Sequence, residues 1–162
     1  MKLYRVSDRY ISYLKGLDTK VPDNYNGKRP YVGVLLFVDD VKYLAPLTSP
    51  KEKHERMKDN DVTLFKLYDA GEADRGLGII NLNNMIPVIE EEITLLDVDA
   101  QSVDYKSLLQ KQIEYIRKNK DLIQSRAKKL RKLVINNHHT KAVAISCNFQ
   151  LLEENYKSFN QN

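Results

Sequence analysis

The hydrophobic period of this chain changes once, near Tyr105, and this change restricts the fold more than any other feature of the sequence. Before it, apolar and β-branched residues form short runs separated by turn residues, which is typical of strands joined by short connections. After it, apolar residues recur at spacings of three, four or seven, which is typical of amphipathic helices. Because most of the strands have no helix between them, they should pair antiparallel, and the expected class is α+β.

About six short strands are expected, and the strand-like runs lie at residues 2–6, 31–38, 41–47, 62–67, 78–82, 85–89 and 92–96. Only Asp39 and Asp40 separate the second of these runs from the third, which predicts an antiparallel hairpin with a two-residue turn. A further β-like run covers residues 141–147.

Helices are expected at residues 8–17, 49–58, 105–118 and 120–136, and after Asn148. Ser7 is placed to cap the first of them, and Asn148 to cap the last. The apolar stripe that follows Tyr105 is interrupted by Lys120, and Asn119 could cap a new start. The sequence therefore predicts two helices in this segment instead of one long helix.

The composition is that of a soluble globular protein, with 42% hydrophobic and 30% charged residues among 162. A single domain over residues 1–162 is expected, large enough to form a core without a disulfide or a metal. Cys147 is the one cysteine, which excludes an intrachain disulfide and a cysteine zinc cluster. Since no segment resembles a signal peptide or a membrane span, we expect a cytoplasmic protein without a cofactor.

Positive charge is concentrated between Tyr105 and Lys141, where eleven Lys or Arg accompany two acids, a net charge of +9. The rest of the chain therefore carries 4 − 9 = −5. The basic residues expected on the outer helix faces are Lys111, Arg117, Lys118, Arg126, Lys128, Lys129, Arg131 and Lys132. A solvated helix face could have this pattern, but the scarcity of acids favours a nucleic acid as partner.

The segment Thr48-Ser49-Pro50-Lys51 lies between the hairpin and a polar helical stretch. Ser49 followed by Pro50, with Glu52 three residues after the serine, is typical of a helix start closed by a capping box. The same segment offers two hydroxyls, a lysine and free N–H groups at a helix N-terminus, which together suit a phosphate. On the residues alone, both interpretations stay open.

A polar loop is expected over residues 18–30, and it contains Tyr25, Lys28 and Arg29. An aromatic ring beside two cations suits a nucleobase stacked next to a phosphate. Loop tyrosines also commonly pack back onto the protein surface, so this feature alone does not decide between the two roles.

The most specific motif of the chain is Lys42-Tyr43-Leu44-Ala45-Pro46-Leu47-Thr48-Ser49-Pro50-Lys51. Further motifs are Tyr10-Ile11-Ser12-Tyr13-Leu14, Leu64-Phe65-Lys66-Leu67, Leu77-Gly78-Ile79-Ile80-Asn81-Leu82, Met85-Ile86-Pro87, Glu92-Ile93-Thr94-Leu95-Leu96-Asp97, Cys147-Asn148-Phe149 and Leu151-Leu152-Glu153-Glu154. In these motifs, which extend over almost the whole chain, the sequence resembles the ToxN/AbiQ family, the protein toxins of type III toxin–antitoxin and phage-abortive systems.

The resemblance implies a sequence-selective endoribonuclease toxin that needs no metal. The implied fold is α+β, a small antiparallel barrel-like sheet of about six strands with peripheral helices, similar to the MazF/Kid toxins. The implied partner is a repeated small antitoxin RNA that folds as pseudoknots and inhibits the toxin in a closed protein–RNA oligomer. The implied substrate is cellular or phage RNA, and no membrane is involved.

The family's active-site positions correspond here to Tyr25, Arg29, Thr48, Ser49 and Lys51. Arg29 stands where the family usually has a lysine, and Lys28 could act in its place. Three more residues match family positions, namely Phe65, Asn81 and His54, and Phe65 and Asn81 are expected to contact RNA. Arg29 is expected to bind phosphate, and Tyr25 to position or stack the target nucleotide.

Metal-free RNA cleavage proceeds by attack of the 2′-hydroxyl on the adjacent phosphorus and gives 2′,3′-cyclic phosphate and 5′-hydroxyl ends. Thr48 and Ser49 are expected to hold the phosphoryl oxygens. Lys51 should supply positive charge and donate a proton to the leaving oxygen, and His54 is a second candidate for proton transfer. The alternative is a non-catalytic basic RNA-binding module in which residues 48–51 only cap a helix.

Overall fold

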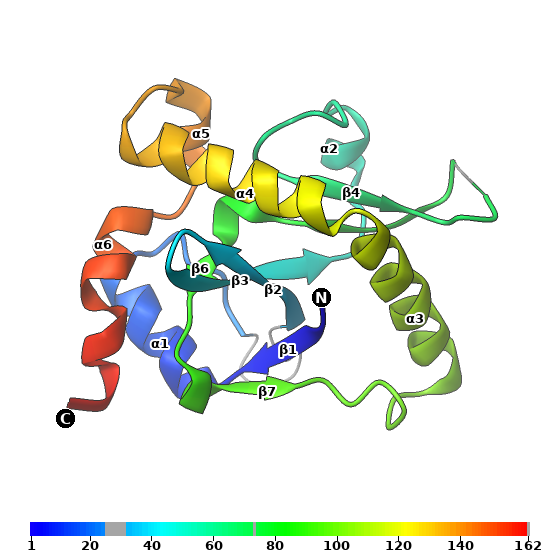
Figure 1. Ribbon diagram of the computed structural model, residues 1–162, viewed down its shortest axis with the longest axis horizontal. Helices are drawn as coiled ribbons and strands as arrows, with labels where there is room; N and C mark the ends of the chain where they lie inside the picture. Colours follow the sequence, from blue (N-terminus) through cyan, green and yellow to red (C-terminus); the bar gives the residue numbers. More distant parts are fainter. Residues whose placement is uncertain (25–31, 73, 162) are drawn as a thin grey trace.

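The computed structural model describes residues 1–24, 32–72 and 74–161. Seven strands form one antiparallel sheet (Figure 1), namely β1 (Leu3–Val6), β2 (Val32–Val38), β3 (Val41–Thr48), β4 (Phe65–Tyr68), β5 (Gly76–Ile80), β6 (Ile86–Pro87) and β7 (Ile93–Leu95). Their order is β4-β5-β3-β2-β1-β7, and β6 pairs with β3 beside this path. The α+β class and the antiparallel pairing are confirmed. The sheet stays open between β4 and β7, so the barrel-like description is only loosely met.

Strand β3 has paired neighbours on both edges. One edge pairs with β2 in the predicted hairpin, with Val38 opposite Val41 at the turn. The other edge is shared, since Leu44 pairs with β6 and Thr48 pairs with β5. A Cβ on Gly33 of β2 would lie 2.3 Å from the carbonyl oxygen of Ala45, so only glycine permits this approach of the two strands.

The helices are α1 (Asp8–Leu17), α2 (Glu52–Glu55), α3 (Val103–Lys118), α4 (Lys120–Ile135), α5 (Thr140–Ile145) and α6 (Phe149–Asn155), with short 3-10 turns η2 (Leu82–Asn84), η3 (Glu90–Glu92) and η4 (Tyr156–Gln161). Ser7 caps α1 and Asn148 caps α6, as predicted. The break at Asn119 between α3 and α4 is also confirmed.

Two predicted elements are wrong. Residues 141–147 do not form a strand, because Thr140–Ile145 is helical and His139 caps this helix by accepting a hydrogen bond from the Ala142 N–H. The β-branched residues Val143 and Ile145 suggested a strand, but this local cap decides the conformation. The helix predicted over residues 49–58 is reduced to the four residues of α2.

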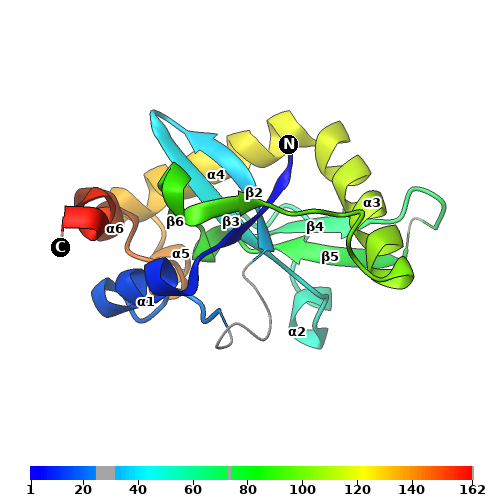
Figure 2. The ribbon, with the colours of Figure 1, turned by 90° about the horizontal axis from the view of Figure 1, so that it is seen from below.

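The helices surround the sheet on several sides (Figures 1 and 2). In both views α1 and α6 lie side by side at one end of the molecule, while α3 lies at the other end. Helix α4 runs between these ends and packs on β2, and α3 packs on β4 and β5. The helices that were predicted from periodicity therefore cover the sheet and also connect its two ends.

The core joins the sheet to the C-terminal helix through aromatic contacts. Tyr43 of β3 and Phe149 of α6 are fully buried and meet edge to face at 6.0 Å between ring centroids. Tyr10 of α1 meets Phe159 in the same way at 5.2 Å. Cys147 is buried, and burial raises the pKa of its thiol to about 12, so it is not a reactive group.

An ion-pair network around Arg131 connects α4, α6 and the β2–β3 turn. The guanidinium Nε and Nη2 bind the two carboxylate oxygens of Glu153 at 2.6 and 2.7 Å, and Nη1 binds Asp39 at 2.9 Å. The Tyr43 hydroxyl donates to the same Glu153 carboxylate. Burial raises the pKa of Glu153, but the hydrogen bonds from Arg131 and Tyr43 outweigh burial and hold this pKa below its usual value.

Replacement of Glu153 by glutamine should lower the free energy of unfolding by about 2 kcal/mol, because the half-buried Arg131 loses its bidentate counter-ion and keeps the exposed Asp39. The pKa of Glu153 is lower in the folded state, so the pair stabilises the protein above about pH 4.5 and this stabilisation disappears as the pH falls below that value. Urea unfolding at pH 7 and pH 4 measures both effects.

The matched control is Glu154→Gln, since the neighbouring carboxylate is exposed and bonds only to Gln150 within the described residues. This variant should unfold within about 0.5 kcal/mol of the wild type at pH 7. Equal destabilisation by the two substitutions would contradict the special role of Glu153.

Candidate active site

Thr48 ends β3 and is held in place by Asn81, which follows β5. The backbone N–H of Asn81 donates to the Pro46 carbonyl at 2.9 Å, and its side-chain amide donates to the Thr48 hydroxyl oxygen at 3.2 Å. Because this oxygen already accepts a hydrogen bond, the hydroxyl hydrogen is directed elsewhere and is available to a bound anion. The structure thus brings together two of the residues expected in the site.

A close approach of α3 supports the same strand end. The buried amide of Gln112 donates to the Leu77 carbonyl at 2.7 Å. A Cβ on Gly78 would lie 2.8 Å from the amide nitrogen of Gln112 and 3.0 Å from the Thr48 carbonyl oxygen, so a glycine is needed between them. Sequence reasoning missed both residues, although a glutamine within the apolar stripe of a helix was a detectable signal.

Ser49, Pro50 and Lys51 leave the sheet as an exposed segment before α2 begins. The prediction that Ser49 caps a helix is wrong, because the N-cap is Lys51 and its backbone is extended, with φ −124° and ψ 154°. Since α2 has only four residues, it does not provide the anion site that was expected at a helix N-terminus. The Ser49 hydroxyl and the Lys51 ammonium make no hydrogen bond or ion pair with any residue that the structure describes.

His54 takes over the capping function that was predicted for Glu52. The imidazole Nδ1 of His54 accepts a hydrogen bond from the backbone N–H of Lys51 at 3.2 Å. The backbone N–H of His54 donates to the Lys51 carbonyl at 2.8 Å. The side chain is buried, and burial together with the positive charges of Lys53, Lys51 and Lys66 lowers its pKa. The neutral imidazole therefore fixes the backbone of Lys51, and it does not share an exposed helix face with that lysine.

Lys66 is a neighbour of the site that the sequence interpretation did not include. Thr48 and Lys66 pair with Ile79 from its two sides, so the three residues lie next to each other across β3, β5 and β4. The Lys66 ammonium donates to the Met57 carbonyl at 2.6 Å and lies 3.2 Å from the Asp59 carboxylate. These contacts attach the segment after α2 to the sheet.

Two residues expected to bind RNA have internal contacts instead of free surfaces. The Phe65 ring is only 4% exposed, and the Arg126 guanidinium lies over it at 4.8 Å. Arg126 also donates to the carbonyl oxygens of Asp59 and Leu64 at 2.8 and 3.0 Å. The geometry gives this pair a structural role at the edge of the site.

The positive charge of α3 and α4 is partly neutralised by ion pairs, some within α3 and some with acids of other segments. Lys111 binds Asp69 at 2.7 Å, and Lys118 binds Glu114 at 2.8 Å. Arg131, which was expected to bind RNA, is held by Glu153. Among the described residues, the side chains of Lys128, Lys129 and Lys132 are exposed and make no ion pair, so their role in RNA binding stays a prediction.

The remaining expected site residues, Tyr25, Lys28 and Arg29, lie in residues 25–31, outside the part of the chain that the structure describes. Within the described part, no group of three or more His, Cys, Asp or Glu side chains is placed to hold a metal ion. In the same part, none of the helices combines the length and the apolar character needed to cross a lipid bilayer.

Comparison with known protein families identifies the family of this chain. The model of the family "Toxin ToxN, type III toxin-antitoxin system" matches residues 2–157. The chain belongs to the ToxN family. It is 43% identical to the endoribonuclease ToxN of Pectobacterium atrosepticum, over 98% of this chain and 94% of the relative. It is 31% identical to the endoribonuclease AbiQ of Lactococcus lactis subsp. lactis, over 94% of this chain and 86% of the relative.

Three solved structures of similar proteins have the same fold as this chain. A structure of a bacterial antiviral system regulated by a processed non-coding RNA superimposes with a TM-score of 0.90 at 41% identity, over 99% of both chains. A type III toxin that a non-coding RNA pseudoknot selectively inhibits gives a TM-score of 0.84 at 30% identity, over 99% of this chain and 98% of the other. AbiQ, a lactococcal anti-phage endoribonuclease, gives 0.88 at 28% identity with the same coverage.

The cap formed by His54 predicts a pH-dependent stability. Because the pKa of His54 is lower in the folded protein than its usual value of about 6.5, the unfolded chain binds the proton first as the pH falls. The free energy of unfolding should therefore decrease below about pH 6.5. Thermal unfolding at pH 7.5, 6.5 and 5.5 measures this decrease.

The control for this prediction is His54→Gln, because glutamine at the third helical position can still accept the Lys51 N–H but does not titrate. The variant should lose less stability than the wild type between pH 7.5 and 5.5. If both proteins show the same decrease, His54 is not the group responsible.

Proposed function

We propose that this chain is an endoribonuclease toxin of a type III toxin–antitoxin system that acts against phage infection, with residues 1–162 forming one catalytic domain in the cytoplasm. The supporting observation is the end of β3, where Thr48 on the strand and Ser49 and Lys51 in the exposed segment after it present two hydroxyls and an ammonium group. AbiQ, a relative named an endoribonuclease, shares this fold over 98% of its chain.

The reaction is cleavage of RNA by its own 2′-hydroxyl, which gives 2′,3′-cyclic phosphate and 5′-hydroxyl ends. The protein has to stabilise the additional negative charge on the phosphoryl oxygens and to move two protons. Thr48 and Ser49 donate hydrogen bonds to these oxygens, and Asn81 keeps the Thr48 hydroxyl oriented. Ser49 does not act as a covalent nucleophile, because the substrate supplies the attacking oxygen.

Lys51 places positive charge beside the phosphate and donates a proton to the leaving 5′-oxygen. The buried His54 holds the Lys51 backbone, and this contact fixes where the ammonium group can reach. Arg29 or Lys28 is expected to supply a second cation, and Tyr25 to position the nucleotide. None of these groups requires a divalent metal, since hydroxyls and cations bind phosphate oxygens directly.

The inhibitor of the enzyme is a repeated antitoxin RNA with a pseudoknot fold, bound directly in a closed protein–RNA oligomer. Solved relatives with 41% and 30% identity are described together with a regulatory non-coding RNA, which supports this partner. The exposed cations of α4, including Lys128, Lys129 and Lys132, are available for its phosphates, and binding should weaken strongly as salt rises.

Substitution of the β3 end tests the catalytic proposal. Lys51→Ala and Ser49→Ala should each lower the cleavage rate by about 10²- to 10³-fold, because each removes one group that stabilises the transition state. The rate is measured on purified protein with a labelled RNA, and the ends are identified as 5′-hydroxyl and cyclic phosphate. Lys53→Ala, an exposed lysine two residues further along α2, is the matched control and should cleave normally.

Cleavage at the wild-type rate by both the Lys51 and the Ser49 variants would remove these residues from the mechanism. A wild-type protein that binds RNA, does not cleave it and leaves cells growing on induction would instead be a non-catalytic RNA-binding module.

Metal removal gives an independent test. Dialysis against EDTA should leave the cleavage rate within about twofold of the untreated enzyme, because hydroxyl and ammonium groups can supply the stabilisation on their own. A large loss that added Mg²⁺ or Mn²⁺ restores would contradict the proposed chemistry.

A further inference from the structure

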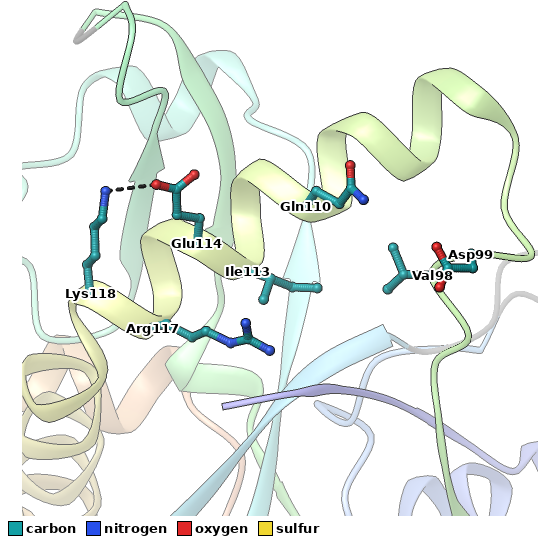
Figure 3. A pocket seen from close by; sticks show the side chains of 7 residues that line it. All are labelled: Val98, Asp99, Gln110, Ile113, Glu114, Arg117 and Lys118. Atoms are coloured by element: carbon teal, nitrogen blue, oxygen red, sulfur yellow. Dashed lines mark hydrogen bonds and ion pairs between the residues drawn. The ribbon is translucent and has the colours of Figure 1, made fainter.

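A cleft of about 610 Å³ lies beside α3 (Figure 3). Its lining comes from α3 and from the segment after β7, and consists of Val98, Asp99, Gln110, Ile113, Glu114, Arg117 and Lys118. Figure 3 shows Ile113 and Val98 on opposite sides of the cleft, with the Arg117 guanidinium extended next to Ile113. The cleft therefore combines apolar walls with a planar cation.

The charges that line the cleft are not equally available to a ligand. Glu114 is paired with Lys118 at 2.8 Å, and Asp99 is paired with Lys106 at 2.6 Å. By contrast, the Arg117 guanidinium and the Gln110 amide have no hydrogen-bond or ion-pair partner in residues 1–24, 32–72 and 74–161. With both acids already neutralised, the cleft offers one unpaired arginine and one free amide.

We propose that this cleft binds an unpaired nucleobase of the inhibitory RNA, stacked on the Arg117 guanidinium between Ile113 and Val98. Guanidinium planes stack on bases that are splayed out of single-stranded RNA, and apolar side chains cover the rest of the ring. The Gln110 amide provides both a donor and an acceptor for the edge of the base. This inference rests on the proposed function, because it assumes an RNA partner.

The position of the cleft on α3 separates its nucleotide from the one that is cleaved. Gln112 marks the face of α3 that packs against β5 beside Thr48. Residues of a helix are rotated by about 100° from one to the next, so Ile113 and Arg117 are turned by roughly 100° and 140° from that face. A base in the cleft is thus held by another side of the helix, which suits an RNA that is retained without being cut.

The test compares oligonucleotides with and without bases on the full-length protein. The probes are a fluorescent 2′-O-methyl hexaadenylate, which lacks the attacking hydroxyl, and an abasic hexamer with the same phosphates. Arg117→Lys keeps the charge and loses the planar face, and Arg75→Lys makes the same change on an exposed arginine outside the cleft. Affinities are measured by anisotropy at one fixed salt concentration, and cleavage of a labelled RNA is measured in parallel.

Arg117→Lys should weaken binding of hexaadenylate by about 5- to 100-fold, the range expected for loss of one base stack. The affinity of Arg117→Lys for the abasic hexamer and its cleavage rate should stay within about twofold of the wild type. The affinity of Arg75→Lys for hexaadenylate should also stay within about twofold. An equal loss of affinity for both probes would make Arg117 a phosphate contact and overturn the base pocket. Unchanged affinity for both probes would also overturn it.

A parallel loss of cleavage would assign the nucleotide to the substrate and overturn its assignment to the inhibitory RNA. If the wild-type protein itself cleaves no RNA, the proposed enzyme activity fails, while the comparison of the two probes still tests the cleft. The two proposals can therefore fail separately.

Discussion

The structure depends first on the pairing of β3 along both of its edges. β2 occupies one edge, while β6 and β5 share the other, so the strand is fixed from the hairpin turn to Thr48. The segment that follows this strand therefore begins at a fixed position. Asn81 then holds Thr48, and His54 holds the backbone of Lys51. A site for a phosphate needs such rigidity, since its donors must already be in place when charge develops.

The basic side chains of α3 and α4 fall into two groups with different roles. Arg126 and Arg131 attach α4 to the rest of the fold through Phe65, backbone carbonyls and Glu153. Arg117 and Lys128 belong to the other group, which has no ion-pair partner in the described part of the chain and is available to a ligand. A count of charges along the chain cannot separate the two groups, because the groups that bind Arg126 and Arg131 come from distant segments.

Much of the fold was predictable because its signals are local. The Ser7 and Asn148 caps, the two-residue turn after Val38 and the break at Asn119 each depend on a few neighbouring residues, and the structure confirms all four. The prediction of a helix that starts at Ser49 failed because a second local cap competes with the predicted one. The capping motif was present, but β3 continues to Thr48 and His54 offers a competing cap at Lys51, which moves the helix start.

The sequence by itself determined the α+β class, the antiparallel hairpin and the family, since periodicity, turn residues and the motif from Lys42 to Lys51 are all read along the chain. Only the tertiary structure decided which polar groups are free. Gln112 reaches the Leu77 carbonyl beside Gly78, and Glu153 neutralises Arg131, through contacts between residues far apart in sequence. Hydrogen bonds and ion pairs act over a few ångströms of space, so the availability of a side chain is known only when its neighbours in the fold are known.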